Sequence, residues 1–81
     1  MTEDDIIGEI SHIETFATGT GVHIRHYLNR RYGRGKWRKR KGIALILDDV
    51  GNPRLAEIHW FETTGIGKRD FKRKHWLEDE L

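Results

Sequence analysis

Residues 42–62, GIALILDDVGNPRLAEIHWFE, constrain the fold more than any other stretch of the chain. Two segments rich in β-favouring residues flank DDVGNP, which contains Gly, Asn, Asp and the only proline, an order typical of a β-hairpin. The first segment, residues 43–47, is apolar at every position, so we expect it to be covered on both faces. The second, residues 54–62, alternates and places Ala56, Ile58 and Trp60 opposite Leu55, Glu57, His59 and Phe61.

The remaining segments predict further elements around this hairpin. Residues 10–17 favour a strand, although the spacing of their isoleucines also permits a helix. A helix is expected over residues 21–32, capped by Thr20 and ended by Gly33. RDFKRKHWL at residues 69–77 predicts a third strand after the loop TTGIG. The predicted fold class is α+β, an antiparallel sheet of three to four strands with one packed helix, and an SH3-like small barrel is the alternative.

Length and composition bound the kind of protein. A chain of 81 residues predicts one small α+β domain over residues 1–81 with a thin core. The absence of cysteine excludes disulfides and favours a cytoplasmic location. The start MTEDDIIGE is acidic where a signal peptide would be basic, and no apolar run is long enough for a membrane helix. We therefore expect no membrane association.

Charge is strongly segregated along the chain although the net charge is only +2. Residues 15–47 contain no Asp or Glu, whereas TEDD opens the chain and EDEL closes it, so the acidic ends can fold back on the basic centre. The run RRYGRGKWRKRKG at residues 30–42 predicts a basic loop between the helix and the hairpin. Lys and Arg neutralise phosphates, the glycines permit close backbone approach, and Trp37 or Tyr32 can stack on a base.

The sequence thus predicts a small, non-catalytic nucleic-acid-binding domain for RNA or DNA. A second basic cluster at residues 68–74 can extend the surface. If six to eight cations contacted duplex phosphates, the slope of log affinity against log salt would be about −5 to −7. The predicted binding residues are Arg30, Arg31, Arg34, Lys36, Trp37, Arg38, Lys39, Arg40, Lys41, Lys72 and Lys74.

Two alternative functions remain open: a ribonuclease and an adaptor for a protein partner. Glu57 and His59 are two apart on a predicted strand and share a face, which is compatible with a toxin-like, metal-independent ribonuclease. The same pair is equally typical of surface groups on a half-exposed strand, and Glu62 is expected on the opposite face. An adaptor that docks an acidic protein partner through the basic surface is the other alternative. Enzymatic activity is thus left open, as is the oligomeric state.

No cofactor or metal is predicted. His23 and His26 are three apart on the predicted helix, but the sequence offers no third clustered ligand. GIGK at residues 65–68 resembles part of a phosphate-binding loop, yet Glu62 and Arg69 occupy positions where that loop needs Gly and Ser or Thr. A glycine-permitted turn explains GIGK better.

Three segments together resemble a group of small, uncharacterised bacterial proteins. These segments are YGRGKWRKRKGIA, AEIHWFE and GIGK, and the resemblance covers roughly residues 24–77. The chain departs from the group's pattern in Arg40 and in TTGIG. The resemblance supports the fold expected above and implies no activity.

Overall fold

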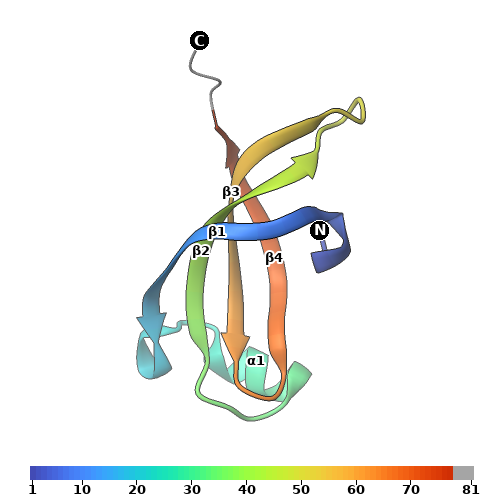
Figure 1. Ribbon diagram of the computed structural model, residues 1–81. Coiled ribbons are helices and arrows are strands. Elements are labelled where there is room, and N and C mark those ends of the chain that lie inside the picture. Colours follow the sequence, from blue (N-terminus) through green and yellow to red (C-terminus); the bar gives the residue numbers. More distant parts are fainter. Residues whose placement is uncertain (78–81) are drawn as a thin grey trace.

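The computed structural model describes residues 1–77, and its largest feature is a four-stranded antiparallel sheet in the order β1-β2-β3-β4 (Figure 1). The strands are β1 (Ile6–Thr18), β2 (Arg38–Leu47), β3 (Pro53–Thr63) and β4 (Gly67–Trp76). One helix, α1 (Arg25–Tyr32), lies between β1 and β2 in the chain, and two short 3-10 turns are η1 (Glu3–Asp5) and η2 (Gly19–Gly21). The predicted α+β class, with a sheet and one helix, is confirmed.

The β2–β3 hairpin forms where the turn residues predict it. Its register pairs Ala44 with Ala56 and Leu47 with Pro53. The carboxylate of Asp48 accepts backbone hydrogen bonds from Val50 and Asn52 at 3.0 and 2.8 Å, which closes the turn. Gly51 lies within it at a φ of 86°, a conformation that favours glycine.

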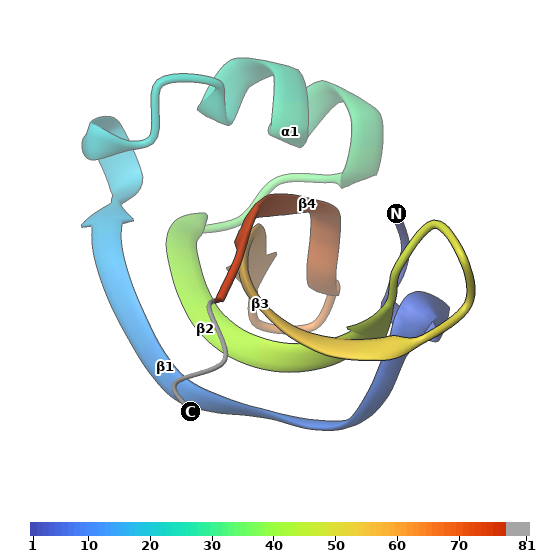
Figure 2. The same cartoon turned by 90° about the horizontal axis from the view of Figure 1, so that it is seen from above.

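The sheet is strongly curved and remains open (Figure 2). β1 and β4 are its two edges, and each pairs with only one neighbour. A closed barrel would require these two edges to pair, so the SH3-like alternative is not what this chain forms.

One face of the sheet, here called the core face, carries the larger hydrophobic cluster. Ile58 and Trp60 are fully buried on β3, and they pair with Gly42 and Arg40 on β2. The buried members of this cluster are Ala44, Ile46, Ala56, Ile58, Trp60 and Phe71. Ile6 and Ile10 of β1 pack against them, so β1 contributes to covering this face.

The opposite face, here called the outer face, is covered at one end by α1. Leu28 of α1, Val22 and Trp37 form a second buried cluster there, and Phe61 of β3 packs against it. The indole nitrogen of Trp37 donates a hydrogen bond to the side-chain oxygen of Asn29 at 3.0 Å. Trp37 therefore fastens α1 to the start of β2.

Several sequence-based expectations need correction. The helix begins at Arg25 and not at residue 21, because Gly19–Gly21 form η2 and Thr20 caps nothing; Ile24 precedes the helix without a side-chain cap. Its end at Gly33 is confirmed, where the glycine adopts a φ of 126° and its N–H donates to the carbonyl of Asn29. Residues 43–47 are not covered on both faces, because burial alternates along β2 and Leu47 is exposed.

The predicted basic loop is also shorter than expected. Its last four cations, residues 38–41, are the first residues of β2. Strand geometry therefore decides where each of these side chains points. Within residues 1–77, no helix combines the length and the apolar character that crossing a membrane requires.

Candidate nucleic-acid interface

Alternation along β2 divides the basic run between the two faces of the sheet. Arg38 and Arg40 pair with Glu62 and Trp60, which places them on the core face. Lys39 and Lys41 pair with Phe61 and His59, which places them on the outer face. The eight cations of the run therefore do not form one continuous surface.

A smaller basic surface does form on the part of the outer face that α1 leaves uncovered. Lys72 of β4 is exposed and pairs in register with His59, so it lies on the same face as Lys41. We name this surface the lysine face and define it by Phe16, Lys39, Lys41, His59 and Lys72. It draws on all four strands.

Phe16 contributes to the lysine face at an irregularity in β1. Thr15 pairs with Arg40 and Ala17 with Lys39, so Phe16 is an extra residue with no partner on β2. The residue is 47% exposed. The ammonium groups of Lys39 and Lys41 lie 5.3 and 5.9 Å from the ring centre, and His59 contacts the ring edge-on at 5.2 Å.

Phe61 is a second aromatic residue beside the lysine face. It is half-buried, it packs against the cluster beneath α1, and the ammonium of Lys39 lies 5.7 Å from its ring centre. Lys39 therefore lies near two phenylalanine rings from different strands. Such cation–aromatic contacts hold the long lysine side chains over the sheet.

Glu57 and His59 share the outer face, as the alternation of β3 predicts. The Nε2–H of His59 donates to Oε2 of Glu57 at 2.8 Å, and Nε2 of His75 lies 3.7 Å from Oε1. The hydrogen bond from His59 lowers the pKa of Glu57 below its ordinary value, and the charges of His75 and Lys41 act in the same direction. The other ring nitrogen of His59, Nδ1, is buried and has no partner within residues 1–77.

The carboxylate of Glu62 interacts with the two arginines of β2 that lie on the core face. Its carboxylate lies 3.5 Å from Arg38 and 3.3 Å from Arg40, and it accepts a hydrogen bond from the indole of Trp60 at 2.9 Å. Burial alone would raise the pKa of Glu62, but the Trp60 hydrogen bond and the charges of Lys68 and Arg40 lower it overall. Arg38 and Arg40 are thus engaged in supporting the core face, away from the lysine face.

The other predicted binding residues lie around α1 or along β4. Arg30 and Arg34 line a hollow of about 360 Å³ beside α1, and Arg31 lies over the ring of Tyr32. Lys36 is exposed, while Trp37 is 1% exposed and its ring cannot reach a base in this conformation. Lys74 is exposed on β4 beside a register irregularity.

The glycines of the basic run serve the fold. Gly33 ends α1, and a Cβ on Gly35 would lie 2.6 Å from the hydroxyl oxygen of Thr63. Gly35 thus permits close approach of two protein segments, whereas the sequence suggested close approach to a nucleic acid.

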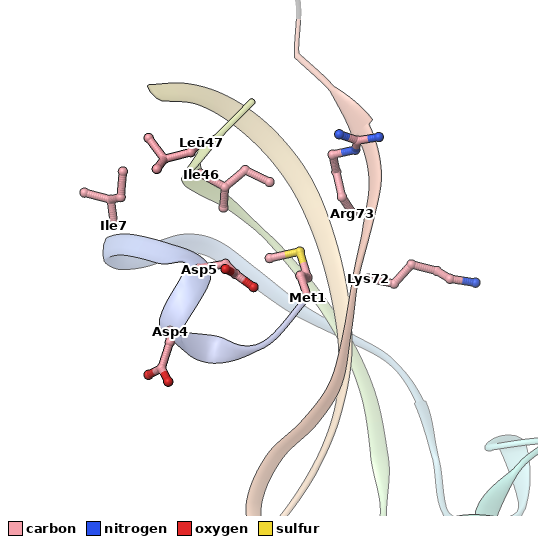
Figure 3. A pocket seen from close by; sticks show the side chains of 8 residues that line it. All are labelled: Met1, Asp4, Asp5, Ile7, Ile46, Leu47, Lys72 and Arg73. Carbon is pink, nitrogen blue, oxygen red and sulfur yellow. The ribbon is translucent and has the colours of Figure 1, made fainter. Parts of the chain in front are cut away.

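The acidic N-terminal segment lies beside β4. Met1, Asp4 and Asp5 line a hollow of about 420 Å³ together with Ile7, Ile46, Leu47, Lys72 and Arg73 (Figure 3). Within residues 1–77, no salt bridge joins η1 to β4. Figure 3 shows Lys72 extending away from this hollow, which agrees with its place on the outer face. The acidic residues 78–81 lie outside the described residues.

Within residues 1–77, no three His, Asp or Glu side chains come together in a way that could hold a metal ion. His23 and His26 are both exposed, His26 on α1 and His23 before it.

Sequence reasoning missed two residues of this region, Phe16 and His75. Phe16 sits in a run of exposed residues on an edge strand, and the irregularity at its position has no clear signal in the sequence. His75 reaches Glu57 because β4 pairs with β3 and a register irregularity lies between Arg73 and His75, whereas regular alternation from Phe71 would have placed His75 on the core face.

Comparisons with family models, with curated proteins and with solved structures gave no match for this chain. The resemblance to small bacterial proteins therefore stays a prediction.

Proposed function

We propose that the chain is a small, non-catalytic nucleic-acid-binding protein whose contact surface is the lysine face. The observation that carries this proposal is the grouping of Lys39, Lys41 and Lys72 with the exposed ring of Phe16 on one face of the sheet. Lysine ammonium groups bind phosphates and release condensed counterions, and aromatic rings stack on bases.

The local charge of this surface supports a polyanionic ligand. Glu57 and Glu14 line a hollow together with Lys41, and Glu57 already interacts with His59 and His75. Lys39 and Lys41 have no salt bridge to a carboxylate within residues 1–77. A phosphate can therefore approach their ammonium groups without displacing an ion pair among these residues.

Binding to short RNA and DNA at several salt concentrations tests the proposal. If each of the three lysines contacts one phosphate, the slope of log affinity against log salt is about −2 for a single strand and about −2.7 for a duplex. These slopes are smaller than the sequence suggested, because fewer cations share this surface. The triple variant Lys39→Gln, Lys41→Gln, Lys72→Gln should lose roughly 100-fold in affinity at about 0.1 M salt.

Arg54→Gln is the matched control. Arg54 is exposed on the core-face side, where it stacks on Trp76 at 4.6 Å, so its loss removes one positive charge away from the lysine face. Its affinity should stay within about twofold of the parent protein. Equal losses for the triple variant and the control would contradict the proposed surface, and binding to an acidic polypeptide in preference to any nucleic acid would favour the adaptor function.

A second candidate function is metal-independent RNA cleavage, favoured by the hydrogen bond between Glu57 and His59 next to the lysines. In this reaction a base removes the proton of a 2′-hydroxyl, whose oxygen bonds to the adjacent phosphorus while the bond from phosphorus to the 5′-oxygen breaks and that oxygen takes a proton from water. His59 would act as the base, Glu57 would orient its ring, and Lys41 would stabilise the phosphate charge. The nitrogen not bonded to Glu57 is buried, so Phe16 or its neighbours would have to move.

Incubation with RNA, followed by separation of the products, tests this second function. Cleavage that disappears in His59→Ala and survives removal of divalent cations would favour the ribonuclease. RNA that stays intact while it binds would favour the non-catalytic function.

We further propose that the protein acts in the cytoplasm. The proposal rests on the absence of cysteine, which removes any dependence on an oxidising compartment. Fractionation of the producing cells tests it, and recovery of the protein outside the cytoplasmic fraction would overturn it.

A further inference from the structure

We infer that the lysine face takes its nucleic acid as a single strand, with one base stacked on Phe16. This inference rests on the proposed function and adds the class of nucleic acid. Three features of the lysine face support it: the placement of Phe16, the width of the surface and the positions of its lysines.

Phe16 has the exposure that a stacking platform needs. Phe16 is an extra residue at an irregularity of β1, and it is 47% exposed beside Lys39, Lys41 and His59. An irregularity of this kind commonly re-aims a side chain at the edge of a sheet. Trp37, the aromatic residue that the sequence favoured for stacking, is buried, so Phe16 takes this role.

A stacked base must have an accessible ring face. In a duplex the bases stack on one another, and only their edges are open to a protein in the grooves. In a single strand the bases can turn outward and stack on aromatic side chains. The ring of Phe16 therefore has a partner in a single strand and none in an intact duplex.

The width of the lysine face also disfavours groove binding. Phe16 lies on β1 and Lys72 on β4, with two strands between them. Neighbouring strands are about 4.8 Å apart, so the surface is about 14 Å wide along the sheet. The major groove of a duplex is about 12 Å wide. A duplex could then contact the lysines only through its phosphates.

The positions of the lysines suit a backbone that runs beside the stacked base. Lys39 and Lys41 are held over the ring of Phe16, and Lys72 extends from β4 on the far side of His59. Phosphates on either side of one stacked base can thus reach lysines on different strands. Base stacking supplies affinity with little sequence preference.

Fluorescence anisotropy with labelled oligonucleotides of about 12 nucleotides tests this inference. One sequence is used as single-stranded DNA, single-stranded RNA and duplex DNA at the same salt concentration. We expect both single strands to bind more tightly than the duplex. Phe16→Leu keeps apolar volume and removes the aromatic face, so it should weaken single-strand binding by roughly 5- to 150-fold and change duplex binding less than about twofold.

Two further variants separate stacking from charge. Phe16→Trp keeps an aromatic face and should retain single-strand binding. Lys41→Gln should weaken binding to single strand and duplex alike and make each salt slope shallower by about 0.7 to 0.9. Circular dichroism confirms that each variant is folded.

The outcomes distinguish the inference from the proposed function. A duplex that binds as tightly as the single strands, or a Phe16→Leu variant with unchanged single-strand affinity, overturns the inference and leaves nucleic-acid binding in place. Absence of binding to all three oligonucleotides overturns the proposed function as well.

Discussion

Glu62 shows how one residue decides which cations are available for a ligand. Its carboxylate interacts with Arg38, Arg40 and the indole of Trp60 at the edge of the core face. Trp60 is fully buried, so its N–H needs an acceptor, and Glu62 supplies it. Two arginines of the basic run are therefore part of the fold's own hydrogen-bond network.

The pH dependence of stability tests this role of Glu62. Its pKa in the folded protein lies below the ordinary value of 4.5, so it contributes stability that is present above 4.5 and lost as pH falls through the lowered pKa. Glu62→Gln should lower the free energy of unfolding by about 1–3 kcal/mol near neutral pH. The difference from the parent protein should shrink as pH falls from about 6 to about 3.

Urea unfolding at a series of pH values measures that difference. Glu9→Gln removes an exposed carboxylate of β1 and should change stability by less than about 0.5 kcal/mol at neutral pH. If the difference in the free energy of unfolding between Glu62→Gln and the parent protein stays constant down to about pH 3, the charge of the Glu62 carboxylate does not stabilise the fold.

At the scale of elements, β2 contains a glycine, Gly42, at a point where β1 leaves no room for a side chain. A Cβ on Gly42 would lie 2.5 Å from Cγ2 of Ile10, 3.0 Å from the carbonyl oxygen of Ser11 and 3.3 Å from the ring of Trp60. A backbone atom is among these neighbours, so the contact cannot be relieved by a side-chain rotation alone. Gly42 thus lets β1 lie against the core face.

Gly42→Ala should therefore destabilise the protein by about 1–3 kcal/mol, through overpacking between β1 and the core face. Gly21→Ala is the control, because its Cβ would meet only the Cβ of Ala17 at 3.8 Å and its φ lies outside the left-handed region. The control should be neutral or stabilising by up to about 1 kcal/mol. Equal stabilities of the two variants in urea unfolding would argue against this packing.

The elements also show what the sequence could and could not predict. The hairpin was predictable because turn residues and alternation agree there, and the burial of β3 follows that alternation. The start of β2 was not, because residues 38–41 are all cationic and leave no alternation of polar and apolar residues to read. In the structure, the pairing of β2 with β3 decides which face each cation occupies. It places Arg38 and Arg40 beside Glu62.

The start of α1 and the position of Phe16 could not be predicted from the sequence, for related reasons. Gly19–Gly21 form a separate short turn, so helical periodicity overestimated α1 by several residues. Phe16 is an extra residue in β1 opposite β2, and such irregularities depend on how two strands pair. The lysines of the candidate site were thus predictable from the sequence, and the place of Phe16 beside them was not.

At the scale of the whole molecule, the sheet separates two surfaces of different composition. The core face buries the larger cluster and holds Arg38 and Arg40, while α1 covers one end of the outer face. The uncovered part of the outer face carries Lys39, Lys41 and Lys72 around Phe16. We propose that nucleic acid binds to this part of the outer face and to no other part of the described molecule.

Amide chemical-shift mapping by NMR, during titration with a short single-stranded oligonucleotide, tests that claim most directly. We expect the largest changes at Phe16, Lys39, Lys41, His59 and Lys72, with little change at Arg54 and Trp76 on the core-face side. Changes concentrated at Arg30, Arg34 and Lys36, or at Arg54 and Trp76, would contradict the account.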